Sequence, residues 1–252
     1  MKSNGLKFGL IGLAGGMVGG MFGVGGGIIM IPLLTWQGFT QKEAQGTSLA
    51  ATIPLAIVSG AMYFKAGSLD LISALPMATG GVIGAFIGSG LVKRFTNRLL
   101  YRLFGLMLLI IAIRHAMTVL GLGSGDDSGQ THVFLAFLAG VLAGCVSGFF
   151  GVGGGVVFVP SGVQLLGLGE KAAQGASFVA IIPTALVGFL RYHASGEVRI
   201  NGIGMIIMGA VLGSFIGSAV AVNIKDTPLA LCFSAFIAII ALKRLIGRNP
   251  QG

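Results

Sequence analysis

Two copies of one glycine-rich motif constrain the fold of this chain more than any other feature. Residues 22–27, FGVGGG, return 128 residues later as residues 150–155, and both copies lie in strongly apolar sequence. Consecutive glycines interrupt a helix, because each one costs roughly 1 kcal/mol relative to alanine. The sequence therefore predicts two broken apolar segments. Interruptions at matching positions of two halves are typical of substrate sites in membrane transporters.

The composition indicates an integral membrane protein. Of its 252 residues, 54% are hydrophobic and 9% are charged, whereas soluble domains contain about 25% charged residues. The net charge of +9 fits basic residues that flank helices and set their orientation. We therefore expect the lipid bilayer as a partner and no nucleic acid. Cys145 and Cys232 lie singly in apolar segments, without zinc-site spacing, so we expect no metal or cofactor.

The repeat extends over nearly the whole chain. Residues 44–48, AQGTS, match residues 173–177, AQGAS, at an offset of 129, and Tyr63 matches Tyr192. The apolar N-terminus aligns with residues 133–149, so we expect it to belong to the repeat rather than to a cleaved signal peptide. Internal repeats of this kind occur in many transporter folds.

We expect an all-α membrane protein with two homologous halves, 1–120 and 132–252, joined by a linker over 121–131. In the first half the sequence predicts a broken segment over 6–37 and helices over 42–64, 71–92 and 99–120. In the second half it predicts a broken segment over 132–167 and helices over 171–193, 201–222 and 228–246.

The lysines and arginines favour broken segments that turn back as re-entrant hairpins. If each segment crossed the membrane, nine Lys and Arg would lie on one side and seven on the other; if each turned back, the division would be twelve against four. Cytoplasmic flanks are enriched in these residues. A hairpin plus three helices is an odd number of crossings, which predicts inverted repeats, six full helices and two cytoplasmic termini. Because residues 6–22 nearly suffice to span a bilayer, a crossing segment remains the alternative.

The glycine turns are candidate anion sites. The helix after each turn is expected to begin near Ile28 or Val156, where free N–H groups and the positive dipole end suit an anion. Consecutive glycine N–H groups can add an anion-binding nest. The alternative is that the glycines only permit close helix packing.

The repeated AQG motif contributes polar side chains to the same prediction. Its glutamines offer a donor and an acceptor, and its hydroxyls either line the site or cap the following helix. We predict no catalytic residue. The predicted substrate-binding residues are Gly25, Gly26, Gly27, Gln45, Gly46, Thr47, Ser48, Gly153, Gly154, Gly155, Gln174, Gly175 and Ser177.

The charged residues carry less information. Arg191, His193, Glu197 and Arg199 cluster at a helix end, which is typical of a solvated cytoplasmic flank; a gating or substrate role is the alternative. No Asp or Glu falls centrally in a predicted helix, so the carboxylate of a proton relay is not visible and the coupling ion stays unassigned.

These motifs resemble the sulfite exporter TauE/SafE family. The resemblance rests on GMFGVGGGIIMIPLL with EAQGTS and on SGFFGVGGGVVFVP with AAQGAS. It implies a polytopic inner-membrane permease for sulfite, sulfonates or related sulfur-containing or organic anions. By motif match, the loop glycines together with Gln45, Ser48, Gln174 and Ser177 would form the site. Ala176 stands where the first copy has Thr47, so the two half-sites would differ.

The sequence leaves three candidate functions. An intramembrane serine hydrolase would use Ser177 and His193, but no GxSxG elbow occurs and sixteen residues of helix would separate the two by roughly 24 Å. A non-transporting scaffold would need a docking domain, which the sequence lacks. We therefore predict a secondary transporter or permease for small anions. The exact substrate, the direction of transport and the oligomeric state, including a homo-oligomer, stay open.

Overall fold

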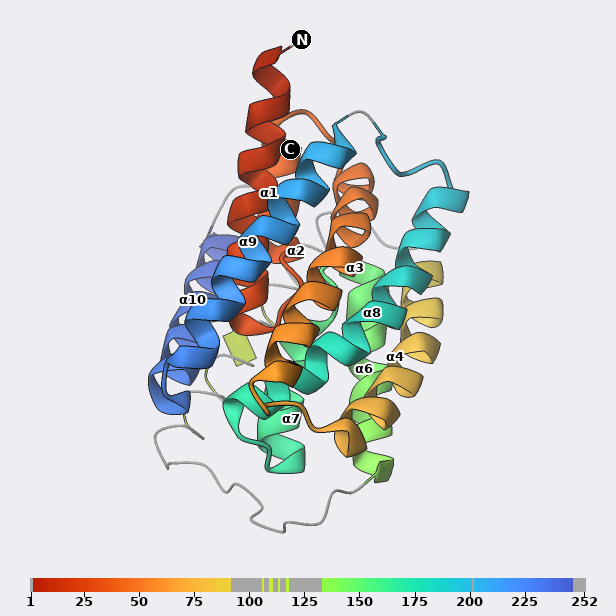
Figure 1. The fold of residues 1–252 in the computed structure, drawn as a ribbon. Helices are drawn as coiled ribbons and strands as arrows, with labels where there is room; N and C mark the ends of the chain where they lie inside the picture. Colours follow the sequence, from red (N-terminus) through yellow and green to blue (C-terminus); the bar gives the residue numbers. More distant parts are fainter. Residues whose placement is uncertain are drawn as a thin grey trace.

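The computed structural model describes residues 2–91, 133–200 and 202–246, together with Leu106, Leu109, Ile110, Ile113 and Met117. No strand occurs in this part of the chain, so the all-α class expected from the sequence is confirmed. Most of the helix expected over 99–120 and the linker expected over 121–131 lie outside the described residues. The helices (Figure 1) are α1 (Lys2–Phe22), α2 (Gly27–Trp36), α3 (Gln41–Lys65), α4 (Leu71–Leu91), α6 (Val133–Phe150), α7 (Gly155–Leu166), α8 (Glu170–Ala194), α9 (Ile203–Asn223) and α10 (Asp226–Ile246).

Six of these helices are long and apolar enough to cross a membrane, namely α1 over residues 5–22, α3, α4, α6, α8 and α9. This set differs from the six full helices expected, because it includes α1 and α6, the first arms of the two broken segments. α2, α7 and α10 over 226–242 count among the shorter apolar helices. The physical reason is that α1 and α6 each continue without a break up to the glycine motif.

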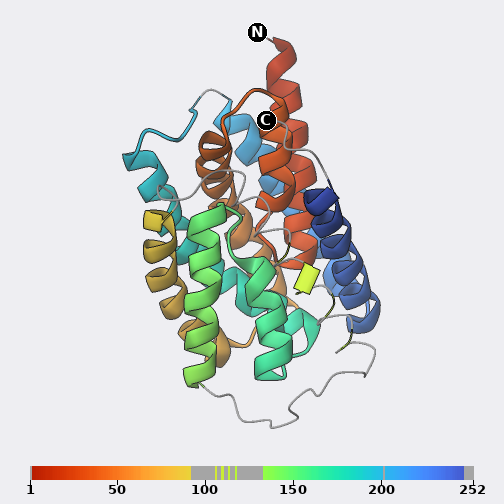
Figure 2. The same cartoon turned by 180° about the vertical axis from the view of Figure 1, so that it is seen from behind.

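Each broken segment folds back on itself at its glycines. Phe8, near the start of α1, packs edge to face against Phe39, just beyond α2, with ring centroids 5.8 Å apart. The start of α7 likewise lies beside α6, where a Cβ added at Gly154 would be 3.0 Å from the Ala143 carbonyl oxygen. In Figure 1, α1 descends from the N-terminus at the top and α6 rises from the lower end, and Figure 2 shows the same two directions from behind.

Two ladders of glycines hold the outer helix pairs together. A Cβ added at any of them would overlap a backbone carbonyl of the partner helix, so no larger residue fits at this separation. Lipid provides no hydrophobic drive between helices, and small residues permit the close packing that replaces it. The ladders consist of Gly80, Gly84 and Gly88 on α4 facing α6, and of Gly209, Gly213 and Gly217 on α9 facing α1.

The helices α3 and α8 form the centre of the bundle. They pack against each other, and each also contacts an outer pair. They are the most buried of the six candidate membrane spans: 61% of the apolar stretch of each is buried inside the protein, against 39–50% for the other four. The repeated AQG motif therefore lies on the two innermost helices.

Candidate functional site

The glycine turns adopt a backbone that only glycine accepts readily. Gly25 and Gly26 have φ angles of 78° and 76°, and Gly153 and Gly154 have φ angles of 84° and 80°. These values lie in the left-handed region, where a Cβ is strained. α2 begins at Gly27 and α7 at Gly155, one residue before the starts expected at Ile28 and Val156.

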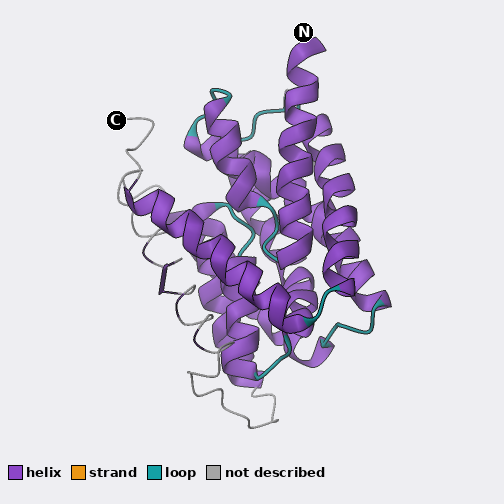
Figure 3. Ribbon diagram, turned by 90° about the vertical axis from the view of Figure 1, so that its left-hand side faces the viewer, coloured by secondary structure: helices purple, strands orange, loops and turns teal. Residues whose placement is uncertain are grey.

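The two turns contact each other inside the helical bundle. A Cβ added at Gly25 would lie 3.6 Å from the Gly153 Cα. Thr52 of α3 touches both turns, since its Cγ2 would be 2.9 Å from that Cβ and 3.1 Å from one added at Gly153. Its hydroxyl donates to the Gly25 carbonyl at 2.5 Å. Figure 3 shows these loop segments in the middle of the molecule, away from the loops at its ends. The structure thus brings the predicted loop glycines of both halves together.

Both turns present unused backbone donors. The first N–H groups of α2 that donate a hydrogen bond are those of Ile29 and Met30, whose nitrogens each lie 3.1 Å from the Gly26 carbonyl oxygen. The N–H groups of residues 25–28 have no acceptor within the described part of the chain, and those of residues 153–156 have none either. Neither helix has a side-chain cap at its start. Donors of this kind at a helix N-terminus, with the positive end of the dipole, favour an anion.

Two buried hydroxyls of the first AQG motif also lack partners among the described residues. Thr47 and Ser48 are fully buried, and neither side-chain oxygen forms a hydrogen bond with a described residue. The Ser48 Oγ would lie 2.9 Å from a Cβ added at Gly27, the first residue of α2. A buried hydroxyl without a partner costs about 1–3 kcal/mol. Ser48 is therefore available for a ligand at the start of α2.

The corresponding serine of the second half is engaged. The Ser177 hydroxyl donates to the Gly23 carbonyl at 2.7 Å. Ala176 has no hydroxyl to match that of Thr47. The two AQG motifs therefore differ in their polar groups around the turns.

The two glutamines link the halves through tyrosines. The Tyr63 hydroxyl of α3 donates to Gln174 Oε1 at 2.6 Å, and the Tyr192 hydroxyl of α8 donates to Gln45 Oε1 at 2.9 Å. Gln45 also packs on the opposite turn, where a Cβ added at Gly151 would lie 2.5 Å from the Gln45 Cβ. Each AQG motif thus supports the glycine turn of the other half.

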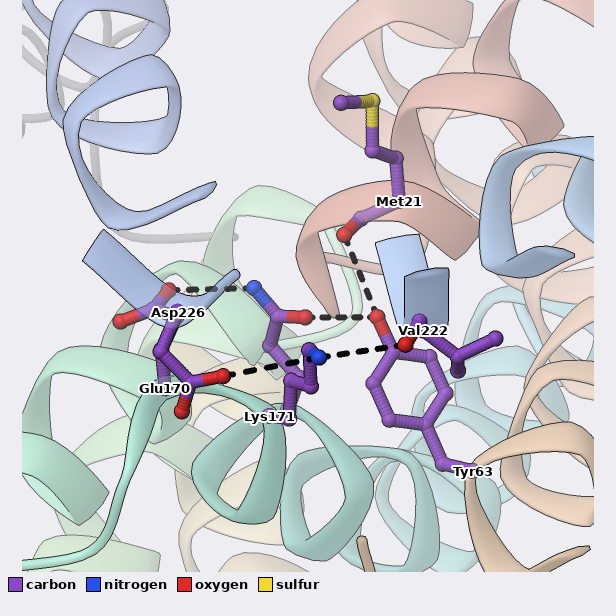
Figure 4. Close-up of polar contacts among 7 residues, drawn as sticks. Met21, Tyr63, Glu170, Lys171, Val222 and Asp226 are labelled. Carbon is purple, nitrogen blue, oxygen red and sulfur yellow. Dashed lines mark hydrogen bonds and ion pairs between the residues drawn. The ribbon is translucent and has the colours of Figure 1, made fainter. Parts of the chain in front are cut away.

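A polar network surrounds Gln174 (Figure 4). Its side-chain amide donates to Glu170 Oε1 at 3.0 Å, and Glu170 is 4% exposed. Lys171 donates to the Val222 carbonyl at 3.1 Å and lies 3.7 Å from the Asp226 carboxylate. The Tyr63 hydroxyl also lies 3.3 Å from the Met21 carbonyl oxygen.

Two of the predicted site residues lie away from the turns. A Cβ added at Gly46 would meet the Glu197 carbonyl oxygen at 2.5 Å, and one added at Gly175 would overlap the Ser68 carbonyl. Both glycines therefore allow the loop after the opposite central helix to approach.

The capping interpretation of the AQG hydroxyls is wrong. α3 begins at Gln41, where Thr40 and Glu43 form a capping box, and α8 begins at Glu170 with Gly169 as its N-cap. Both helices start three residues before the motif, so Thr47, Ser48 and Ser177 lie in their second turns rather than at their N-caps.

Sequence reasoning missed five residues around the turns. Tyr63 and Tyr192 were visible as a repeated pair but received no role. Glu170 lies four residues before Gln174, which places both on one helix face. Thr52 and the buried, unpartnered hydroxyl of Ser147 have no hydroxyl counterpart in the other half, so the repeat gave no signal for them.

The geometry also bears on catalysis and metals. Ser177 bonds to a backbone carbonyl, whereas His193 is exposed and stacks on Phe189 with ring centroids 5.7 Å apart. No group of three His, Cys, Asp or Glu that could hold a metal occurs among the described residues.

Two glycine-broken hairpins that meet inside a bundle of membrane-spanning helices define a multi-pass membrane transporter. The chain belongs to the sulfite exporter TauE/SafE family, whose sequence profile matches residues 8–244. The resemblance noted from the motifs is thereby confirmed.

The relatives support the same class. The probable membrane transporter protein YunE of Bacillus subtilis is 26% identical over 92% of this chain and 93% of its own length. A probable membrane transporter protein of Xylella fastidiosa is 29% identical over 84% and 82%, and one of Methanocaldococcus jannaschii is 27% identical over 94% of each chain. The family and these relatives are transporters rather than enzymes. No solved structure matches the chain significantly.

Proposed function

We propose that the protein is a secondary transporter, or permease, for small anions, with sulfite, sulfonates and related sulfur-containing or organic anions as its substrates. The observation that carries this proposal is the Ser48 hydroxyl, buried and unpartnered beside the start of α2. A positive helix terminus, free amide donors and a free hydroxyl at one place suit an oxyanion.

The anion would be held mostly by backbone N–H groups, at a central site formed by the two glycine turns. The donors are the N–H groups of residues 25–28 and 153–156, with the hydroxyls of Thr47 and Ser48 completing its shell. Gln45 and Gln174 would support the turns rather than bind the anion. Gln45 accepts a hydrogen bond from Tyr192 of the other half, and Gln174 accepts one from Tyr63. Ser177, bonded to Gly23, keeps the first turn in place.

The proposal includes two inverted repeats in the inner membrane, with both termini cytoplasmic. The reciprocal tyrosine–glutamine bonds and the opposite directions of α1 and α6 in Figure 1 support the inverted repeats, and the excess of Lys and Arg on one side supports the cytoplasmic termini. Transport would then proceed by rocking one repeat against the other around the central turns.

Anion flux in proteoliposomes tests the proposal. Sulfite, thiosulfate, ethanesulfonate, sulfate and acetate are compared with and without a proton gradient, which also reveals coupling. We expect selective flux of a sulfur oxyanion or sulfonate, reduced about tenfold or more by Ser48→Ala, the usual loss for a hydrogen bond to a charged group.

Ser234→Ala is the matched control, because Ser234 is also buried but bonds to the Ala230 carbonyl of its own helix. Equal flux in Ser48→Ala and Ser234→Ala would contradict the site. No flux of any tested anion through folded protein would contradict the substrate class.

A further inference from the structure

A cavity of about 330 Å³ opens at the end of the molecule where α3 begins and α8 ends, at the top of Figure 1. We call it the vestibule; its polar lining residues are Lys42, Ser89, Arg191, Tyr192, Ser195 and Glu197. Tyr192 connects it to the turns, since the hydroxyl of this lining residue donates to Gln45, which packs on Gly151. The Tyr192–Gln45 bond thus links the lining of the vestibule to the second glycine turn.

The Arg191 guanidinium lines the vestibule and has no counter-ion among the described residues. Its Cζ lies 4.4 Å from the centroid of the Phe86 ring of α4, a cation–π arrangement. It forms no ion pair with any residue that the structure describes. Stacking fixes the plane of the guanidinium, so its fork of donors stays available to an oxyanion.

The second cation of the vestibule is only loosely paired. Lys42 Nζ lies 3.7 Å from Glu197 Oε1, and the two side chains are 40% and 31% exposed. Solvent-exposed ion pairs at this distance contribute little. Among the described lining residues there are two positive charges and one negative charge, and the carboxylate can be displaced.

We propose that the vestibule is a second anion-binding site, from which a small sulfonate or similar oxyanion passes Tyr192 to the glycine turns. Arg191 binds the oxyanion through its fork, and Lys42 binds it after leaving Glu197. The passage inward rests on the proposed function, but the binding itself does not. Glu197 competes with the anion, so removal of its charge strengthens binding while removal of either cation weakens it.

Arginine labelling tests the binding directly. Purified protein is treated with phenylglyoxal, which modifies arginine, at rising ethanesulfonate concentrations, and modification is quantified by mass spectrometry. Arg199 is the matched control, because it also stacks on a phenylalanine, with its Cζ 4.7 Å from the Phe39 centroid, but does not line the vestibule. We expect ethanesulfonate to slow the modification of Arg191 about tenfold, as a charge-assisted contact implies, and to leave Arg199 unchanged. Equal behaviour of the two arginines would overturn the proposal.

Substitutions test whether each charged side chain strengthens or weakens anion binding. Arg191→Gln and Lys42→Gln should each raise the apparent KM for ethanesulfonate about tenfold, Glu197→Gln should lower it, and Arg199→Gln should leave it unchanged. A purely structural role for these side chains would not reverse the sign at Glu197, so a raised KM in Glu197→Gln would overturn the proposal.

The failure of the vestibule and the failure of the central site are distinguishable. Ser48→Ala should reduce flux about tenfold or more but retain the protection of Arg191 by ethanesulfonate. Protection without flux in the unmodified protein would support the vestibule and contradict the proposed transport. Loss of protection in Ser48→Ala would show that Arg191 reports only the central site.

Discussion

The two tyrosine–glutamine bonds are equivalent in sequence but differ in what surrounds them. Around Gln174 and Tyr63, a buried carboxylate accepts from the glutamine amide and Lys171 binds the Val222 carbonyl. Around Gln45 and Tyr192, the lining of the vestibule takes the place of these contacts. One end of the central site is thus closed by buried polar contacts and the other borders a cationic cavity.

This difference traces to positions where the repeat diverges. Glu170 corresponds to Gln41 in the first half, and Glu197 corresponds to Ser68. The duplication therefore provides the common contacts, and a few unmatched residues make the surroundings of the two bonds differ. In the proposed function, this difference would decide from which end an anion approaches the glycine turns.

The largest expected effect breaks the contact that both ends share. Gly153→Ala would place a Cβ 3.1 Å from the Thr52 Cγ2 at a φ of 84°, so the Thr52 methyl group between the two turns must shift by a few tenths of an ångström. We expect flux to fall about tenfold, because a displacement of about 1 Å in a binding constellation costs about 100-fold.

The matched control for this change is Gly38→Ala. Gly38 has the same φ of 84°, but nothing lies within 4 Å of an added Cβ. It should incur the backbone strain of about 1 kcal/mol and retain flux. If both variants lost flux equally, backbone strain rather than the contact between the turns would be responsible.

A smaller effect separates the two tyrosines. Tyr63→Phe removes the donor to the buried Gln174 oxygen and should lower the free energy of unfolding by about 1–3 kcal/mol. Tyr192→Phe should cost less, because water from the vestibule can replace the lost partner of Gln45. Thermal unfolding in one detergent measures both; a greater loss for Tyr192→Phe would reverse the assignment of the closed and open ends.

The smallest effect concerns the two lysines that occupy matching positions. Lys171 is 21% exposed and also binds the Val222 carbonyl, whereas Lys42 is 40% exposed and, within the described residues, pairs with Glu197 alone. Lys171→Gln should lower the unfolding free energy by about 1 kcal/mol, and Lys42→Gln by less than about 0.5 kcal/mol. Equal denaturation midpoints for the two variants would remove this part of the comparison.

The local features of the fold could be predicted from the sequence. The central helices were expected over 42–64 and 171–193, and α3 and α8 extend only one residue further at each end. Both breaks fall at the predicted glycines. Glycine propensity and apolar length act within a few residues, so they are readable without knowledge of the packing.

The composition of the site was decided only by the tertiary structure. Tyr63 and Gln174 are 111 residues apart in sequence, and nothing local indicates that they meet. Ser48 and Ser177 occupy matching positions, yet one hydroxyl is unpartnered and the other bonds to Gly23.

The sequence by itself determined a duplicated helical membrane protein with two breaks and a pair of repeated polar motifs. Only the packing of α3 against α8 decided which polar groups of one half meet the turn of the other, and which cations line the vestibule. The physical reason is that helix formation depends on neighbouring residues, whereas hydrogen bonds between distant segments depend on how whole helices fit together.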